Sequence, residues 1–185
     1  MKNGQIIIGI DPGTRLMGYG VIRINGSKME TLALGVVRMA SIKDHYRRMS
    51  HILEKMYELL DAFQPDCMAI EAPFYSKNVQ SMLKLGRAQG VAIAAALSRN
   101  VPVCEYAPRK IKMAVTGRGA ASKEQVAAML KHMMHFTQEF ESLDATDALA
   151  VAVCHANQLK LQEKTAPAGS WEAFVSKNPQ RIVRK

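Results

Sequence analysis

The sequence IIIGIDPGTRLMGYGVI, residues 6–22, decides the fold of this chain. It begins with apolar residues at positions 6–10, interrupted only by Gly9, and continues directly into Asp11 and a Pro-Gly turn. A short apolar run that ends at a turn is typical of a buried strand. We therefore expect a strand at 6–10 that holds Asp11 at its carboxyl end. Asp before Pro-Gly is also an ordinary turn residue, and both readings are open from this stretch alone.

The strands and helices that follow predict an α/β fold. Asn25-Gly26 is a strong hairpin signal and separates strands expected at about 18–24 and 30–37. Apolar residues three and four apart predict an amphipathic helix from 41 to 63. The segments after it are a buried parallel strand at 67–71, an Ala-rich helix at 79–99, a strand at 101–107, and helices at about 122–134 and 144–161.

This order, βββαβαβαα, predicts a mixed five-stranded sheet flanked by helices, with three antiparallel strands followed by parallel ones. Residues 1–161 are expected to form one domain. Residues 162–185 are rich in small and basic residues and are expected to be a mobile basic tail. No stretch of about 18 apolar residues occurs, and the apolar segment near the N-terminus is short for a signal peptide. We therefore expect a cytoplasmic protein without a membrane partner.

The three cysteines, Cys67, Cys104 and Cys154, lie far apart in apolar runs. This distribution predicts reduced thiols in the core and neither a disulfide framework nor a zinc site. His155 is expected to be a packing or surface residue. The expected reduced thiols fit a reducing compartment.

The chain is strongly basic, with a formal net charge of +9, which favours an anionic partner such as nucleic acid. The stretch RKIKMAVTGRGAASK, residues 109–123, has no acid, and we expect a basic loop that leads into a capped helix. Its alternative is a solvated loop without a partner. The basic residues in it are Arg109, Lys110, Lys112, Arg118 and Lys123.

Four acids fall where active sites gather in sheets of this kind, outside the carboxyl ends of the strands. Asp11 ends the first strand, Glu71 ends the strand at 67–71, and Asp144 and Asp147 lie three apart at the start of the last helix. Each has an ordinary alternative as a turn residue, a surface acid or a helix cap. A cluster of carboxylates, however, repels itself unless a cation is present, and oxygen ligands suit Mg²⁺ or Mn²⁺. Two such ions beside a basic surface indicate phosphodiester chemistry.

Four motifs in order resemble those of the RuvC family, the bacterial Holliday-junction resolvases of the RNase H-like superfamily. The similarity extends over about residues 5–160. The motifs are IIGIDPGTRLMGYGVI, MAIEAPFYSKNVQSMLKLGRAQGV, YAPRKIKMAVTGRGAASKEQV and LDATDALAVAVCHA.

The resemblance implies an RNase H-like fold and an Mg²⁺-dependent endonuclease that nicks two opposed strands of a four-way junction during recombination and repair. It implies that Asp11, Glu71, Asp144 and Asp147 are the catalytic, metal-binding residues, with two Mg²⁺ per site and Mn²⁺ as a substitute. Some family members carry His at the position of Asp144.

Among the basic residues, the resemblance implies functional roles for Lys112 and Lys123. Phe74 matches an aromatic residue implicated in holding the junction open, and Tyr75 is a candidate assistant, although either ring could be core.

The resemblance also implies a homodimer and the RuvA-RuvB branch-migration complex as a partner. The candidate interface is the helix at 79–99, whose apolar stripe could equally pack on the sheet. The stripe consists of Met82, Leu85, Ala88, Val91, Ala92 and Ala95.

Three other functions remain to be separated from this one. An actin-like or sugar-kinase ATPase also begins with an Asp-x-Gly-Thr type turn, but it pairs two domains and this chain provides one. A non-catalytic junction-binding protein would be expected to lack some of the acids. Another RNase H-like nuclease, acting on RNA-DNA hybrids or other branched DNA, is the nearest alternative.

Overall fold

The computed structural model describes residues 4–73, 78–134 and 142–165, with side chains described as far as Leu161. Five strands form a single mixed sheet in the order β3-β2-β1-β4-β5. Strands β1, β2 and β3 are antiparallel neighbours, whereas β4 runs parallel to β1 and β5 runs parallel to β4. The strands are β1 (Gln5–Asp11), β2 (Leu16–Asn25), β3 (Lys28–Arg38), β4 (Cys67–Glu71) and β5 (Val103–Tyr106). The predicted RNase H-like sheet is therefore confirmed.

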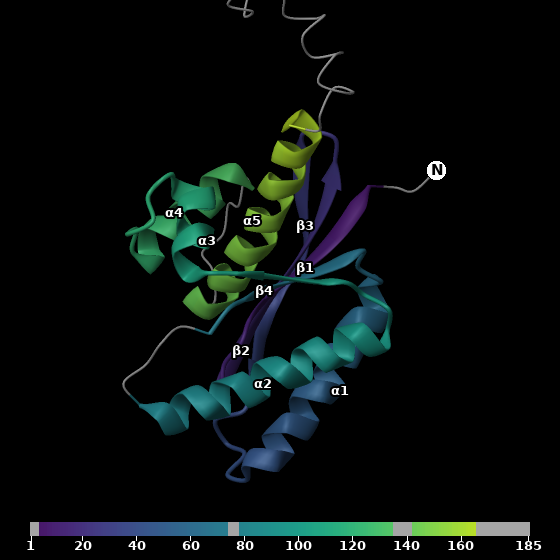
Figure 1. Cartoon of the computed structure of the whole chain (residues 1–185), viewed down its shortest axis with the longest axis vertical. Coiled ribbons are helices and arrows are strands. Elements are labelled where there is room, and N and C mark those ends of the chain that lie inside the picture. The colour runs from purple at the N-terminus through teal and green to yellow at the C-terminus, as the bar shows by residue number, and fades with distance from the viewer. Residues whose placement is uncertain (1–3, 74–77, 135–141, 166–185) are drawn as a thin grey trace, which may run out of the picture.

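Helices cover both faces of the sheet (Figure 1). One face packs against α1 and α2, with Ile8, Met68 and Ile70 buried between them. The other face packs against α5, and α3 and α4 cover the outer side of α5. The helices are α1 (His45–Phe63), α2 (Val79–Ser98), α3 (Pro108–Thr116), α4 (Lys123–Met133) and α5 (Leu143–Thr165).

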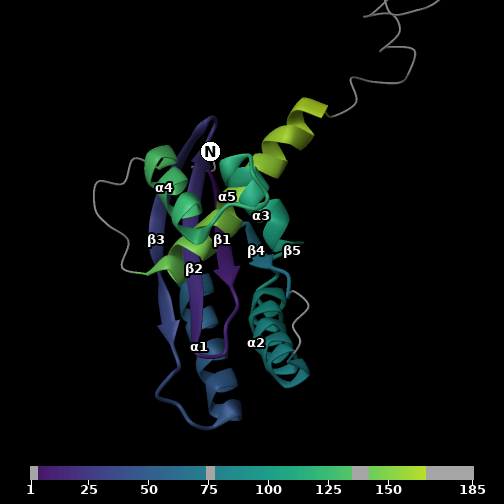
Figure 2. The ribbon, with the colours of Figure 1, turned by 90° about the vertical axis from the view of Figure 1, so that its left-hand side faces the viewer.

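Helix α5 lies directly on the backbone of β1 and β2, on the face of the sheet that is turned toward the viewer in Figure 2. A Cβ atom added to Gly9 would lie 2.2 Å from the carbonyl oxygen of Ala148, and one added to Gly18 would lie 2.1 Å from that of Asp144. Both distances are far below van der Waals contact, so only glycine allows the helix to come this close. From Ala148 to Cys154 every residue of α5 is buried, as expected for a helix enclosed by a sheet and two other helices.

The structure has one more helix than the sequence predicts, because the basic stretch after residue 108 is not the expected loop. Helix α3 begins with Pro108 in its first turn and ends at Gly117, whose φ of 72° is left-handed. These are ordinary start and stop signals for a helix. Ile111 and Val115, four residues apart, bury the inner face of α3 against the core, while Arg109 and Lys110 are exposed.

The first helix also begins later than predicted, at His45 and not at Ser41. Asp44 is its N-cap, and its side chain accepts a hydrogen bond of 2.8 Å from the backbone N–H of Arg47. Toward the C-terminus, α5 continues to Thr165, so residues 162–165, the first four of the predicted tail, are helical. The rest of the predicted tail lies outside the described residues.

Much of the apolar stripe predicted on the helix at 79–99 packs inside the protomer. Ala88, Ala92 and Ala95 lie on the side of α2 that faces the sheet, and all three are fully buried. The large apolar residues of α2 that are exposed are instead Val79 and Leu83 in its first turns and Leu97 near its end. Within the described ranges, no helix has the length and apolar character needed to cross a membrane.

Substitution of Gly18 by Ala should lower the stability of the fold. The added Cβ must displace the first turn of α5, because backbone atoms are the nearest neighbours. We expect a loss of about 2 kcal/mol or more in the free energy of unfolding, typical of an overpacked core position. Denaturant unfolding measures the loss. An unchanged midpoint would contradict the close approach.

Candidate active site

Two of the predicted acids lie side by side at the carboxyl ends of neighbouring parallel strands. Ile10 of β1 is in register with Ile70 of β4, and Asp11 and Glu71 are each the next residue along their strand. A hydrogen bond joins the two side chains. Gln89 of α2 donates a hydrogen bond of 3.4 Å to the backbone oxygen of Glu71, which fixes the end of β4 from the other face of the sheet.

The other two acids come from the first turns of α5. The backbone N–H of Asp144 donates a 3.2 Å hydrogen bond to Ser142 Oγ, and Asp147 lies one turn further along. Because α5 rests on Gly9 and Gly18, and Gly18 is in register with Asp11, this turn of the helix lies over the end of β1. Carboxylate oxygens of Asp11, Asp144 and Asp147 all lie within 4.8 Å of one another.

Burial and mutual repulsion change the protonation of this cluster. Burial, the charge of Glu71 and the hydrogen bond to Glu71 raise the pKa of Asp11 from 3.8 to about 8. Burial also raises the pKa of Glu71, although its hydrogen bond with Asp11 acts in the opposite direction. Asp11 therefore holds a proton that it donates to the Glu71 carboxylate, as expected for two carboxyl groups that share one site.

Lys123, the first residue of α4, inserts its ammonium group among the acids. It donates a hydrogen bond to Asp147 and lies 3.6 Å from Asp144. Burial opposes its charge, but the hydrogen bond to Asp147 and the nearby carboxylates together raise the pKa of Lys123. The sequence placed Lys123 in a basic segment but gave no sign that it pairs with the acids.

A cavity of about 540 Å³ opens in front of the acids. It brings together Asp11, Glu71 and Asp147 with the side chains of Lys112, Lys123 and Arg109. Lys112 is near enough for its charge to lower the pKa of Glu71 against the effect of burial. The walls also include Leu85, which the sequence assigned to the apolar stripe of the helix at 79–99, and two apolar residues that the sequence did not single out, Ile111 and Val126.

Two of the predicted basic residues do not line this cavity. The ammonium of Lys110 lies 5.1 Å from the centre of the Tyr106 ring, and Arg118 lines a separate shallow hollow beside α4. Phe74 and Tyr75, the predicted aromatic contacts, lie outside the described residues.

The donor set fits a divalent cation. It consists of carboxylate oxygens, which suit hard cations such as Mg²⁺, Mn²⁺ and Ca²⁺. Burial is the main cause of the raised pKa values of Asp11 and Glu71, and the charge of Asp147 raises both further, whereas Lys123 lowers them. A bound cation would supply the missing positive charge.

A sheet of this order, with carboxylates from its first and fourth strands and from the helix across it, defines the RNase H-like class of nucleases. Comparison with known proteins narrows the class. The family of RuvC crossover junction endodeoxyribonucleases matches residues 7–155. The chain is 53% identical over 180 residues to the Bacteroides fragilis crossover junction endodeoxyribonuclease RuvC, and the aligned region covers 96% of each of the two chains. It is 52% identical over 182 residues to the Christiangramia forsetii protein of the same name, covering 98% of this chain and 95% of that one.

Comparison with solved structures indicates the same family. Thermus thermophilus RuvC in complex with a Holliday junction substrate superposes with a TM-score of 0.80 at 32% identity, covering 85% of this chain and 96% of that chain. The chain therefore belongs to the RuvC family of crossover junction endodeoxyribonucleases.

The stability of the metal-free protein should fall as pH rises. The pKa of Asp11 is 3.8 in an ordinary environment and about 8 in the fold. Between these values the folded protein holds a proton that the unfolded chain has lost, so stability is present below about pH 4 and is lost progressively toward pH 8. In EDTA, Asp11→Asn should remove most of this decline and raise Tm at pH 8 by at least about 3 °C. Each unit of pKa difference between the folded and unfolded states corresponds to about 1.4 kcal/mol, and 1 kcal/mol to about 2 to 4 °C at this size.

Thermal unfolding across this pH range measures the effect. Glu54→Gln, at an exposed position on α1, is the control and should keep the wild-type profile. Parallel profiles for wild type and Asp11→Asn would refute the raised pKa.

Proposed function

We propose that this protein resolves Holliday junctions by Mg²⁺-dependent hydrolysis of one phosphodiester bond in each of two opposed strands. The observation that carries the proposal is the convergence of acids from β1, β4 and α5 with Lys112 and Lys123 around one cavity, in a member of the RuvC family. The identified relatives are named for crossover junctions, and one is solved with such a junction.

The four acids would hold the cation. Asp11, Asp144 and Asp147 offer oxygens close to one another, and Glu71 joins them through Asp11. Mg²⁺, for which Mn²⁺ can substitute, supplies Lewis acidity toward phosphate and lowers the pKa of water, and two ions per site would serve both the attacking and the leaving oxygen. To act as ligands, Asp11 and Glu71 release their shared proton to solvent.

The lysines would receive the phosphate. Lys112 lies at the cavity wall and Lys123 at the N-terminus of α4, where Ser122 and Gln125 form a capping box. The dipole of a helix N-terminus favours an anion, and the two ammonium groups add to this. With a phosphate present, Lys123 has a third anion to pair with besides Asp147 and Asp144.

Outside the cavity, Arg109, Lys110 and Arg118 would extend the positive surface for the DNA backbone, in line with the net charge of +9. Phe74 and Tyr75 would stack on bases that are unpaired at the junction centre.

A homodimer would present two such sites to the two strands, because a four-way junction has approximate two-fold symmetry. The surface that supports this is the exposed side of α2, where Val79 and Leu83 are 57% and 49% exposed. We expect the RuvA-RuvB complex to be a partner. We also expect the protein to act in the cytoplasm, because its proposed substrate is chromosomal DNA.

The deciding experiment is cleavage of a synthetic four-way junction by wild type and Asp11→Asn. Wild type should produce paired nicks in Mg²⁺ and none in EDTA. Asp11→Asn should bind the junction but cut at least about 100-fold more slowly, because it removes a ligand and leaves the basic surface intact. Gel analysis of nicks and of bound junction separates the two properties.

Three outcomes would overturn the proposal. Substantial cutting by Asp11→Asn would remove the metal site from the mechanism. Junction binding without cutting by wild type would favour a non-catalytic binding protein. Faster cleavage of an RNA-DNA hybrid than of the junction would favour a different RNase H-like nuclease.

Lys112→Ala should weaken junction binding and lower the slope of log K against log salt by about 1, as expected for the loss of one phosphate contact. Filter binding at several salt concentrations measures the slope. Lys55→Ala, on α1 across the sheet, is the matched control and should keep the wild-type slope. An unchanged slope for Lys112→Ala would mean that this lysine makes no direct phosphate contact.

A further inference from the structure

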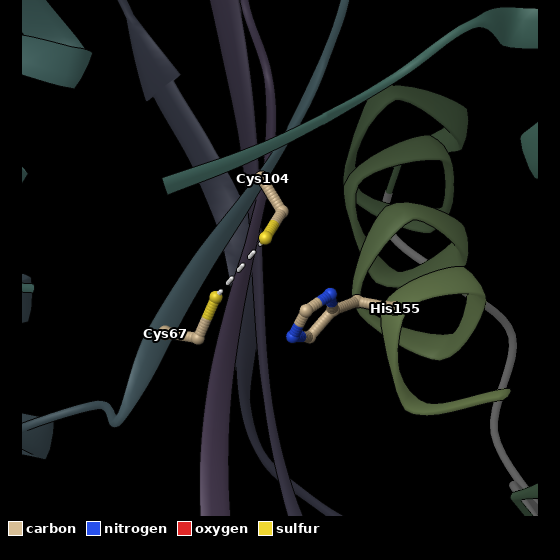
Figure 3. A group of neighbouring side chains, drawn as sticks. All are labelled: Cys67, Cys104 and His155. Atoms are coloured by element: carbon tan, nitrogen blue, oxygen red, sulfur yellow. Dashed lines mark hydrogen bonds between the residues drawn. The ribbon is translucent and has the colours of Figure 1, made fainter. Parts of the chain in front are cut away.

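Two cysteines and a histidine that the proposed function does not use meet inside the protein. Cys67 of β4, Cys104 of β5 and His155 of α5 point toward one another (Figure 3). The two sulfur atoms are 3.9 Å apart, and a nitrogen of His155 lies within 4.8 Å of both. The sequence predicted separate core thiols, because the three residues are far apart along the chain.

The fold brings these residues together on the face of the sheet that α5 covers. Side chains two residues apart on a strand share a face, so Cys67 lies on the same face as Glu71, and Cys104 on the same face as Tyr106. Cys67 and His155 are 6% and 5% exposed, whereas Cys104 at the edge strand is half-buried. A small ion can therefore approach from the β5 edge into an otherwise closed site.

The spacing fits tetrahedral coordination by a thiophilic cation. Zn–S bonds of about 2.3 Å at tetrahedral angles put two sulfurs about 3.8 Å apart, close to the distance between Cys67 and Cys104. With Zn–N bonds of about 2.0 to 2.1 Å, the histidine nitrogen would lie about 3.6 Å from each sulfur. It lies within 4.8 Å of both, so His155 needs a shift of at most about 1 Å to complete the set.

The surroundings of His155 resemble those of a metal-ligating histidine. The Tyr106 hydroxyl lies 2.7 Å from Nδ1, which leaves Nε2 for a metal. A polar partner on the second nitrogen orients the ring and fixes its tautomer in most histidine metal sites. Burial lowers the pKa of His155, so the ring is neutral, the form that binds metal.

We propose that Cys67, Cys104 and His155 form a second metal site, separate from the acidic cluster, that binds Zn²⁺ with a water molecule in the fourth position. On binding, the two thiols each lose a proton to solvent and His155 supplies a lone pair. Soft thiolate ligands select Zn²⁺ over Mg²⁺, the reverse of the carboxylate cluster. The two sites therefore take different metals from the same solution.

Such a site would fasten the edge of the sheet. Strand β5 has four residues and pairs only with β4 among the described strands, so a metal that joins Cys104 to β4 and α5 would hold it in place. Cys67 is four residues from Glu71, about 13 Å along β4, and His155 is eight from Asp147, about 12 Å along α5. The site would tie together the two elements that carry the acids without touching the cavity.

Full-length, reduced, metal-free protein would be titrated with Co²⁺ and then Zn²⁺ in excess Mg²⁺. Sulfur-to-cobalt charge-transfer absorption reports thiolate ligands alone, so carboxylate binding does not contribute. We expect one such Co²⁺ per chain, displaced by Zn²⁺, and a rise in Tm of about 5 °C or more at 100-fold excess over Kd. Cys154→Ser is the matched control, since Cys154 is buried but outside the cluster, and it should behave as wild type.

Cys104→Ser, at the half-buried position, should lower the affinity by about 100-fold and abolish the Zn²⁺-dependent rise in Tm. If this variant does not fold, protection from alkylation in wild type decides: Zn²⁺ should slow modification of Cys104 by at least about 10-fold. Absence of charge-transfer absorption in wild type, equal absorption in Cys104→Ser, or unchanged alkylation would overturn the proposal. So would a Cys67–Cys104 disulfide that forms in mild peroxide as fast with Zn²⁺ present as without it, because thiolates held by Zn²⁺ should be protected from oxidation.

Discussion

The close approach of α5 to the backbone of β1 and β2 is the constraint on which the rest of the structure depends. The helix can descend this far only because Gly9 and Gly18 present no side chain under Ala148 and Asp144. Gly9 is two residues before Asp11, and Gly18 is in register with Asp11. The contacts that fix the depth of the helix therefore also fix the distance between its acids and the end of β1. Packing and active-site geometry are set by the same residues.

This arrangement has an energetic cost that the fold offsets only in part. Asp11 is kept beside Glu71 and Asp147 in a largely buried position, and its pKa rises to about 8 as a result. Lys123 supplies one positive charge, through its contacts with Asp147 and Asp144. A site that needs more positive charge than the chain provides gives up stability in exchange for affinity toward cations, a common relation between stability and function.

The sequence predicted what depends on local pattern. The strand at 6–10, the acids at strand ends and the order of strands along the chain all follow from apolar runs and turns. Helix α3 carried the usual signals, Pro108 at its start, Gly117 at its end and Ile111 four residues before Val115, but its many charges favoured a loop. The pairing of Lys123 with Asp147 depends on how α4 packs on α5, which no local pattern encodes. The meeting of Cys67, Cys104 and His155 likewise depends on strand register and on the depth of α5.

The two clusters on the α5 face differ in what burial does to them. Buried carboxyl groups that must ionise for function repel one another, so the acidic cluster is unfavourable without a cation. Burial instead raises the pKa of the Cys67 thiol to about 12 and keeps His155 neutral, so the sulfur cluster is uncharged and compatible with the core when empty. The first cluster therefore requires a metal to reach its working state, whereas the second can take one or do without. Because both include β4 and α5, a metal at the second would limit how far Glu71 and Asp147 can move apart when the first site is empty.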